Sequence, residues 1–490
     1  MRVLFVIPSA FVSEPLGVLQ LMAVVRKAGH QAGLEIVGRG DPARRVERWP
    51  PDVIAYSAMS SSADAISRED ARLRATLRAR GRSAFRIMGG PHATFCPGVL
   101  DEMALDAICQ GDGDRALPEL LGRLESGAAL EGIANIGLSI SGAPVRELVE
   151  DLDALPFPDR GDYYRAVPVY RDMGVRSFST SRGCPYKCTY CFNHAYNRMF
   201  KDCGKLIRRR SVGNVITEIQ KVMAEHPPVR FIRFADDTFA HRADAWLEEF
   251  AKSYSREVKV PFYCLMRSNT MNDDTAGLLA KAGCRSVGMS LEAGSEEVRN
   301  AILGRNLSDR DVKRSFAAAR RHGLRTYTNT MLGVPGTTPA DDMMSLEYTR
   351  RIRPAAATFT ICCPYPGTRI HEFARERGLL DDGSEPAGSY ADLSVLNCYT
   401  QREKEQQART CYLGPLYCFV PAFLLPLVRL VMKSRLSLRL CNLLGSLYTQ
   451  YRMATRIAPW ALPRNPLALV RFVRSWLGFF SPRKRPGGER

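Results

Sequence analysis

The sequence predicts an α/β protein built as a doubly wound, Rossmann-like domain, a partial (β/α)6 barrel and a helical C-terminal region. Short apolar runs alternate with amphipathic helical stretches over residues 1–140, and the same alternation resumes over residues 176–385. A stretch rich in Pro, Asp and Arg at 141–175 is typical of a linker with turns. Residues 386–490 turn to amphipathic, Arg-rich segments, which indicates a helical region.

The composition is that of a globular protein in a reducing compartment. Of the 490 residues, 45% are apolar and 24% are charged, which supplies cores for two or three domains. The 14 cysteines are mostly scattered singly, and the N-terminal MRVLFVIP lacks the long apolar segment of a signal peptide. We therefore expect a cytoplasmic location, and we treat the isolated cysteines as small core residues.

The net charge of +18 is concentrated near one end of the chain. Residues 401–490 hold 16 Lys or Arg against three Glu, so +13 of this charge lies there. The preceding 400 residues are close to neutral for their size. Because the excess is confined to the C-terminal region, the charge does not indicate a nucleic-acid partner.

The first domain is expected to bind a ligand where its strands end. No G-x-G-x-x-G follows the first strand, so a dinucleotide site is not favoured. Glycines follow the third and fourth predicted strands instead, at the carboxyl ends where doubly wound sheets bind ligands. The predicted strands are RVLFVIP at 2–8, VIAYSAM at 53–59, FRIMGG at 85–90 and DAICQGDGD at 106–114, with helices near 17–30, 64–80 and 116–124.

The second domain is expected to place its chemistry at the carboxyl ends of its strands, as α/β barrels do. About six strand–helix units fit its length, which points to a partial barrel. The predicted strands are SFSTSRG at 177–183, VRFIRFAD at 229–236, PFYCLMRS at 261–268, SVGMSLEA at 286–293, RTYTNTMLGV at 325–334 and ATFTICCP at 357–364.

Three cysteines follow the first barrel strand within eight positions: Cys184, Cys188 and Cys191. A structural zinc site takes four ligands, and a disulfide framework takes an even number of cysteines. Three thiolates in one loop suit an iron–sulfur cluster that keeps one iron open. A zinc knuckle completed by His194 or Cys203 remains an alternative.

The C-x3-C-x2-C pattern resembles the defining motif of the radical S-adenosylmethionine (SAM) superfamily, and Tyr190 matches the usual aromatic before the last cysteine. The resemblance implies a [4Fe–4S] cluster held by Cys184, Cys188 and Cys191. It also implies that the amino and carboxylate groups of SAM chelate the fourth iron. Reductive cleavage of SAM would then give a 5′-deoxyadenosyl radical.

Other segments resemble the SAM contacts of the same superfamily. The resemblance implies that carboxylates after the second and fourth barrel strands bind SAM. A carboxylate suits this role because it makes a charge-assisted hydrogen bond to the ammonium group of SAM. An acidic helix N-cap is the alternative for Asp237. In the segment MLGVPGTTPAD, Thr337 replaces the usual Glu, which puts one polar contact in doubt. The SAM contacts implied by the resemblance are Tyr190, Asp236, Asp237, Glu292, Gly333 and Pro335.

The first domain resembles the cobalamin-binding domain that precedes many radical SAM enzymes, through the segments at 14–30, 89–94 and 110–114. PYPGT at 364–368 matches the barrel ending of such members. No D-x-H-x-x-G is present, so the resemblance implies cobalamin without an axial histidine from the protein. A flavodoxin-like domain with an empty ligand site is the alternative. The implied cobalamin contacts are Ser57, Gly89, Gly90, His92, Gly111 and Gly113.

These features resemble the group that contains class B radical SAM methyltransferases and the anaerobic magnesium-protoporphyrin cyclase. The resemblance implies cobalamin-dependent methylation of an unactivated carbon in a lipophilic, anionic or natural-product small molecule, with a flavodoxin or ferredoxin as reductant. Cyclisation or rearrangement of a tetrapyrrole- or lipid-like substrate is the alternative within the group. A non-catalytic iron–sulfur sensor or electron carrier is a further alternative, although a carrier normally closes its cluster with a fourth cysteine.

The segment at 412–433 is strongly apolar but contains Pro415, Pro421 and Pro426, so we do not expect one membrane-spanning helix there. Two interpretations stay open. The helices could pack on the barrel, or they could form an interfacial cap that contacts a membrane or a lipophilic substrate. SPRKRPGGER at 481–490 is expected to be a disordered tail.

Overall fold

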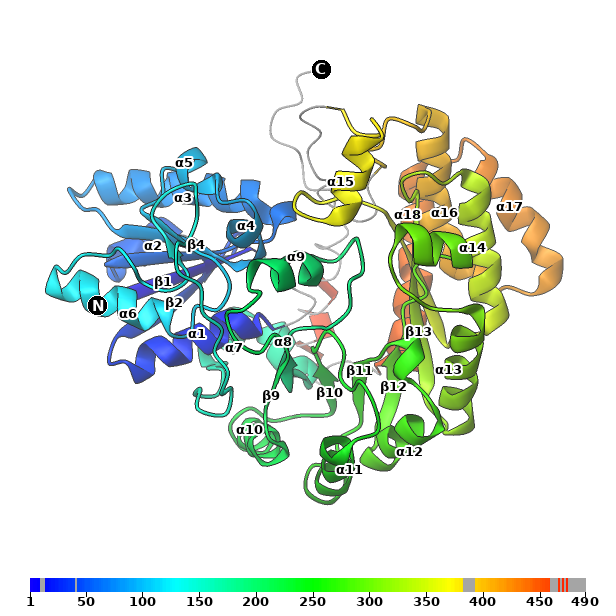
Figure 1. The fold of residues 1–490 in the computed structure, drawn as a ribbon, viewed down its shortest axis with the longest axis horizontal. Coiled ribbons are helices and arrows are strands. Elements are labelled where there is room, and N and C mark those ends of the chain that lie inside the picture. Colours follow the sequence, from blue (N-terminus) through cyan, green and yellow to red (C-terminus); the bar gives the residue numbers. More distant parts are fainter. Residues whose placement is uncertain are drawn as a thin grey trace.

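The structure is a computed structural model, and it describes residues 1–8, 14–39, 42–381 and 393–458 together with the pairs 466–467, 469–470 and 473–474. The predicted tail at 481–490 lies outside the described residues. Two parallel sheets stand side by side, each with helices around it, and three further helices cover the far flank of the second sheet (Figure 1). The predicted fold class is confirmed.

The first sheet has the strand order β2-β1-β3-β4-β5-β6, parallel except for the edge strand β6. Alternate residues of β1 enter different cores: Phe5 packs on one face of the sheet and Leu4 on the other. This is the doubly wound arrangement. The strands are β1 (Arg2–Ile7), β2 (Gln31–Ile36), β3 (Val53–Ser57), β4 (Phe85–Gly89), β5 (Ala107–Cys109) and β6 (Ile136–Gly137). The helices are α1 (Leu16–Lys27), α2 (Pro42–Arg48), α3 (Ala63–Arg78), α4 (Gly90–Phe95), α5 (Val99–Glu102) and α6 (Ala116–Ser126).

Two of these strands, β2 and β6, were not among the four predicted. QAGLEI opens with Gln, Ala and Gly, which have low strand propensity, so its apolar signal is weak. β6 is only two residues long. Residues 141–175, expected as a linker, hold the helices α7 (Gly161–Ala166) and α8 (Pro168–Met173). These helices bury Tyr163 and Tyr170 against the core of the first domain.

The second sheet has the order β14-β13-β12-β11-β10-β7, with every pair parallel. β7 and β14 are its edges and do not pair with each other, so the barrel is partial, as predicted. Helices α10 to α14 lie on its outer side (Figure 1). The strands are β7 (Val175–Phe178), β10 (Phe231–Phe234), β11 (Phe262–Leu265), β12 (Cys284–Gly288), β13 (Arg325–Leu332) and β14 (Ala356–Ile361). The helices are α9 (Phe192–Met199), α10 (Val212–Glu225), α11 (Ala245–Glu257), α12 (Asp273–Ala282), α13 (Asp309–Arg321), α14 (Pro339–Ile352) and α15 (Arg369–Glu376), and a small hairpin joins β8 (Ser181–Arg182) to β9 (Arg208–Arg209).

The C-terminal helices are α16 (Gln401–Phe419), α17 (Leu425–Lys433) and α18 (Leu438–Arg452). Thr400 and Glu403 form a capping box that starts α16. Pro415 lies inside α16, and the helix ends at Phe419, before Pro421. No helix within the described residues is long and apolar enough to cross a membrane.

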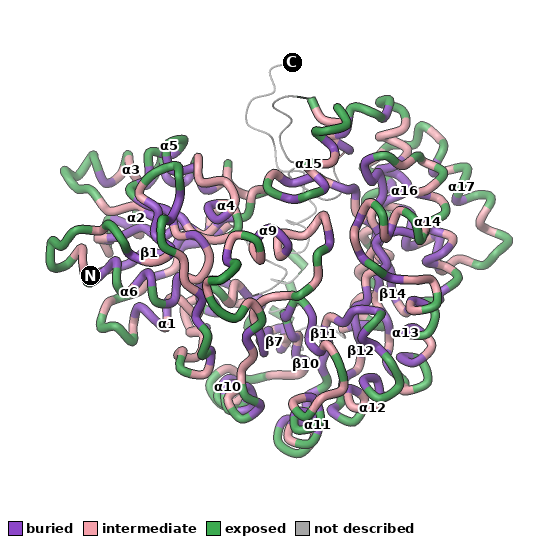
Figure 2. Tube along the Cα trace, viewed as in Figure 1, coloured by how far each residue is buried: buried purple, intermediate pink, exposed green. Residues whose placement is uncertain are grey.

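These helices are an integral part of the barrel. Leu413 and Tyr417 of α16 share a core with Phe359 of β14. Further on, Ile457 packs with Phe231 and other residues at the amino-terminal ends of the strands. The Ser286 hydroxyl donates to the carbonyl of Ile457 over 2.7 Å. Both α16 and β14 contain many buried residues, which are drawn in purple (Figure 2). The interpretation that this region packs on the barrel therefore holds for α16 and for residue 457.

Candidate active site

The three-cysteine loop runs between β8 and α9, at the carboxyl end of the first barrel strand. Gly183 opens the loop with φ of +92°, and a Cβ there would stand 2.0 Å from the carbonyl oxygen of Leu206. Only glycine allows this close approach. The Cys191 amide donates to the carbonyl of Cys188 over 3.1 Å, which folds the loop back on itself. Cys188 is buried, and Cys184 and Cys191 are half-buried.

Burial raises the pKa of Cys191 to about 12, with Asp237, Cys188 and Cys184 adding to the rise. Burial also raises the pKa of Cys184. Because neighbouring negative charge disfavours the thiolates of Cys184 and Cys191, a bound cationic metal would stabilise them.

Two N–H groups point at the sulfur atoms. Arg267, at the end of β11, donates to Sγ of Cys188 over 3.4 Å and stacks on Tyr186 at 4.0 Å. Asn193 donates to Sγ of Cys191 over 3.7 Å. Donors of this kind suit anionic sulfur ligands. Sequence reasoning missed Arg267, because it lies 79 residues from Cys188 and no local motif marks it.

The described residues contain no group of three or more His, Cys, Asp or Glu already arranged around a metal position. The cysteine sulfurs would therefore need to move closer together to hold a cluster. Cys203 donates to the Lys201 carbonyl over 3.6 Å, and His194 is buried in α9. Neither is assembled with the three cysteines as a fourth zinc ligand.

Glu292 follows β12 and is held in an unusual backbone conformation, with φ of +68°. Its amide donates to the Asn329 carbonyl and its carbonyl accepts from the Met331 amide, which pins the residue to β13. A left-handed conformation at a non-glycine residue is uncommon and is concentrated at functional sites. The backbone thus aims this carboxylate into the mouth of the barrel.

Tyr190 and Arg305 meet the Glu292 carboxylate there. The Tyr190 hydroxyl donates to Glu292 over 3.1 Å, and Arg305 donates to the Tyr190 oxygen over 2.6 Å. Burial raises the pKa of Glu292, and the charge of Arg305 partly opposes that rise. Arg305 is a site residue that the sequence did not reveal, since it stands in a loop after residue 302 without a motif.

The two aspartates after β10 have different surroundings. Asp236 is buried and accepts from the Thr180 amide and hydroxyl and from the Ser181 hydroxyl, over 2.6 to 3.0 Å. It therefore fastens β10 to the turn after β7. Asp237 lines the main cavity, and burial raises its pKa. Of the pair, Asp237 is placed to meet a ligand in the cavity.

The glycine turn after β13 lies against α16 instead of the main cavity. The Gly333 amide donates to Asp342 over 2.8 Å, and a Cβ on Gly333 would crowd Gln407. Tyr399 donates to the carbonyl of Val334, next to Pro335. Neither Gly333 nor Pro335 is among the residues lining that cavity.

On the facing domain, the ends of β3, β4 and β5 line three neighbouring hollows, all bordered by Gly90 and Gly111. Gly90 and Gly111 border the main cavity of about 710 Å³ and a second cavity of about 390 Å³. Ser57 and Gly113 line the second cavity, and Gly89 lines a narrow slot of about 60 Å³ inside the domain. A cradle of glycines at strand ends leaves room for a flat, extended cofactor.

His92 is set apart from these hollows. It lies in α4, its Nδ1 stands 3.2 Å from the Ser60 hydroxyl, and it lines none of the three. Its neighbour Thr94 does line the main cavity and accepts from the Gly111 amide over 3.2 Å. Thr94 was not predicted.

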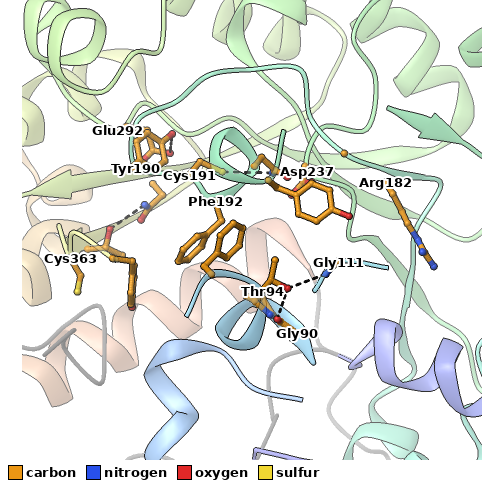
Figure 3. A pocket seen from close by; sticks show the side chains of 18 of the residues that line it. Gly90, Thr94, Gly111, Arg182, Tyr190, Cys191, Phe192, Asp237, Glu292 and Cys363 are labelled. Atoms are coloured by element: carbon orange, nitrogen blue, oxygen red, sulfur yellow. Dashed lines mark hydrogen bonds between the residues drawn. The ribbon is translucent and has the colours of Figure 1, made fainter. Parts of the chain in front are cut away.

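The main cavity joins both domains (Figure 3). Glu292, Tyr190 and Cys191 border it from the barrel, while Gly90 and Gly111 border it from the first domain. The carboxyl ends of the two parallel sheets therefore open into one space. The predicted residues that line it are Tyr190, Cys191, Asp237, Glu292, Gly90 and Gly111.

An aromatic wall runs along this cavity from one domain to the other. Phe95 of α4 stacks on Phe192 at 4.6 Å between ring centroids, and Phe192 meets Tyr365 at 5.8 Å. Phe192 follows the last cysteine of the loop directly. The cavity therefore has an apolar surface next to the cysteines.

Comparison with known proteins agrees with this architecture. The B12 binding domain family matches residues 2–121, and the Radical SAM superfamily matches residues 178–348. The chain carries a B12 binding domain ahead of a radical SAM domain. It is a radical SAM enzyme whose cofactors are a [4Fe–4S] cluster, SAM and cobalamin. The predicted resemblance and cofactors are confirmed at this level.

Two relatives show the range of the group. An uncharacterized methyltransferase of Pyrococcus horikoshii is 27% identical over 382 residues, covering 75% of this chain and 79% of the relative. The anaerobic magnesium-protoporphyrin IX monomethyl ester cyclase of Cereibacter sphaeroides is 24% identical over 418 residues, covering 79% and 65%. These relatives support an enzyme over a non-catalytic carrier.

A solved structure shares the fold. It is the cobalamin-dependent SAM radical enzyme OxsB with aqua-cobalamin and SAM bound. The TM-score is 0.70 at 14% identity, covering 98% of this chain and 75% of that one. At this identity the likeness shows the common architecture only.

Proposed function

We propose that this enzyme cleaves SAM reductively and methylates an unactivated carbon of a lipophilic or natural-product small molecule in a cobalamin-dependent reaction. A one-electron donor such as a flavodoxin or ferredoxin would supply the reducing equivalents. One observation carries the proposal: a single cavity of about 710 Å³ is bordered by the cysteine loop on one side and by the Gly90 and Gly111 turns on the other. A substrate in that cavity contacts both cofactor regions at once.

Different residues of this chain would hold the different cofactors. Cys184, Cys188 and Cys191 would hold the cluster, with Arg267 and Asn193 donating to the sulfurs. The loaded cofactors supply a carbon-centred radical on the substrate and a methyl donor for it.

Glu292 and Asp237 present carboxylates to the cavity from the barrel side, so we assign them the amino group and neighbouring polar groups of SAM. The hydroxyl of Tyr190 and the guanidinium of Arg305 fix the orientation of the Glu292 carboxylate. The wall formed by Phe95, Phe192 and Tyr365 would bind the apolar part of the substrate and exclude water from the reacting carbon.

The test uses the full chain, reconstituted anaerobically with iron, sulfide and cobalamin. It would receive SAM carrying a trideuterated methyl group, a flavodoxin reducing system and an organic-solvent extract of cells. Methylation predicts 5′-deoxyadenosine, S-adenosylhomocysteine and a product heavier by a trideuterated methyl group in mass spectrometry. Formation of neither 5′-deoxyadenosine nor labelled product would argue against any radical SAM activity.

Cyclisation is the second candidate, because one relative is a magnesium-protoporphyrin ester cyclase. It predicts a different balance of products in the same assay. A cyclase consumes SAM to 5′-deoxyadenosine and methionine, forms no S-adenosylhomocysteine and transfers no deuterium label. Incubation with magnesium-protoporphyrin ester would then give a product with fewer hydrogens, whereas a methyltransferase would leave that compound unchanged.

A further inference from the structure

Helix α18 carries a row of exposed apolar side chains on the side away from α16. Its opposite side packs against α16. Cys441 and Gly445 are buried there, and a Cβ on Gly445 would stand 1.9 Å from the carbonyl oxygen of Tyr412 in α16. The exposed row repeats with helical spacing and is between 42% and 58% exposed. It consists of Leu440, Leu443, Leu444, Leu447 and Tyr451.

Helix α17 and the turn before it show the same division. Val428 and Met432 are buried against the core shared with α16, whereas Leu427 and Leu430 are 57% and 66% exposed. Phe423, in the turn that precedes α17, is 78% exposed. Green exposed segments mark this helix at the outer edge of the molecule (Figure 2). Several large exposed apolar side chains on neighbouring elements usually mark an interaction surface.

The chain segment that carries these rows is cationic. Between residues 406 and 458 it has seven Lys or Arg and no Asp or Glu. Lys433, Arg435 and Arg439 are exposed at the connection between α17 and α18, between the two leucine rows. The C-terminal layer thus combines an aliphatic surface with a cationic one.

A hollow of about 670 Å³ adds to the cationic character beside α17. Arg350, Arg351, Arg353 and Arg429 line it together with one acidic residue, Glu347. Arg429 donates to Glu347 over 2.7 Å, so four guanidinium groups stand against a single carboxylate. Leu425 borders the same hollow. A phosphate group bound there would contact guanidinium groups and lie beside an apolar edge.

A second copy of the chain is a poor occupant of this face. A symmetric contact would bring two cationic surfaces together, and the described residues from 406 to 458 contain no acidic side chain that could pair across it. An anionic lipid surface matches both properties, because its phosphates face the arginines and its acyl chains take up leucines. Helices α17 and α18, with nine and 15 residues, are suited to lie on such a surface.

We propose that α17 and α18 dock this enzyme on an anionic lipid membrane surface. The leucine rows and Phe423 enter the boundary between headgroups and acyl chains, while Lys433, Arg435 and Arg439 meet the lipid phosphates. This inference goes beyond the proposed reaction and does not depend on it.

The test is flotation of the full chain with vesicles of phosphatidylcholine, and with vesicles of an equal mixture of phosphatidylcholine and phosphatidylglycerol. The wild-type chain floats with the anionic vesicles, and added salt weakens the binding. The double variant Leu443→Ser and Leu444→Ser loses more than about tenfold in partition coefficient, because each leucine withdraws apolar surface from water. Arg435→Gln and Arg439→Gln each lose about fivefold on anionic vesicles.

The matched control is Ile140→Ser, which removes a side chain that is 54% exposed on the first domain and should leave flotation unchanged. Thermal melting checks that each variant stays folded. Absence of wild-type flotation, or flotation that the leucine changes do not reduce, would overturn the proposal. Equal binding to neutral vesicles would overturn its headgroup part. A wild-type dimer that Leu443→Ser and Leu444→Ser convert to a monomer would assign the face to a second copy instead.

Discussion

Arg182 and Asp114 join the two cofactor domains through a pair of hydrogen bonds, over 2.6 and 3.0 Å between guanidinium nitrogens and carboxylate oxygens. Arg182 stands two residues before Cys184, and Asp114 belongs to the glycine turn that follows β5. Arg208 adds an ion pair to the neighbouring Asp112. The loop that would hold the cluster is therefore fixed against the turn that would hold cobalamin.

Breaking this pair should destabilise the chain more than breaking an exposed one. Asp114 is buried and is the nearer of the two carboxylates that pair with Arg182, so Asp114→Asn should lower the free energy of unfolding by about 1–3 kcal/mol. The exposed pair of Arg165 with Asp162 provides the control, where Arg165→Gln should cost under about 0.5 kcal/mol. Urea unfolding measures both, and a cycle with Arg182→Gln gives the coupling. Equal losses for the two pairs would contradict the assigned role.

Replacing Cys184, Cys188 or Cys191 by Ala should abolish cluster loading and SAM cleavage, because each would remove one of three iron ligands. Iron content, visible absorbance and 5′-deoxyadenosine formation measure the effect. Cys203→Ala is the matched control, since that half-buried cysteine lies in the same region but bonds to the Lys201 carbonyl. A variant of the trio with full iron content would refute the ligand assignment.

Glu292→Gln should weaken SAM binding by about 10- to 100-fold, through loss of a charge-assisted hydrogen bond. Burial raises the pKa of Glu292 above its ordinary value of 4.5. The carboxylate is therefore protonated at a higher pH than a free glutamate, and SAM affinity should fall as pH decreases through that raised pKa. Equilibrium binding of SAM to the cluster-loaded chain across pH measures this. The Gln variant should lack the acidic fall, and an identical pH profile in both proteins would exclude Glu292.

Asp342 should make the fold less stable as pH rises. Burial raises its pKa to about 7, from an ordinary value of 3.8. Between about pH 4 and 7 the folded state keeps a proton that the unfolded state has released, so the free energy of unfolding falls across this window and levels off above it. Asp342→Asn should flatten that slope in urea unfolding at pH 5 and pH 8. Asp101→Asn, at an exposed position, should keep the wild-type slope.

Gly445→Ala should destabilise the packing of α18 on α16 by about 1–3 kcal/mol, because the added methyl overlaps the backbone of Tyr412. Gly122→Ala is the control in α6, where a Cβ meets nothing within 4 Å. That change should stabilise the chain by about 0.5–1 kcal/mol, since alanine favours helix. Thermal unfolding compares the two. Opposite signs are expected, and stabilisation by both would mean that α18 shifts easily.

The site could be predicted from sequence to the extent that it is local. The cysteine trio, Glu292 and the glycine turns stand within short segments whose spacing carries the signal. Arg305 and Arg267 could not be predicted in this way. They bond to Tyr190 and Cys188, which lie 115 and 79 residues away along the chain. The sequence also could not predict that Asp236 and Asp237 have different surroundings. This difference depends on how Thr180 and Ser181 fold over β10.

The sequence by itself determined the two parallel sheets and the three-cysteine loop, because apolar periodicity and ligand spacing act over a few residues. Only the tertiary structure decided that both sheets direct their carboxyl ends into one cavity and that Phe95, Phe192 and Tyr365 line up along it. It also decided that α18 presents leucines outward. The physical reason is that these features arise from packing between segments far apart in the chain, where burial and charge pairing, and not local propensity, select the arrangement.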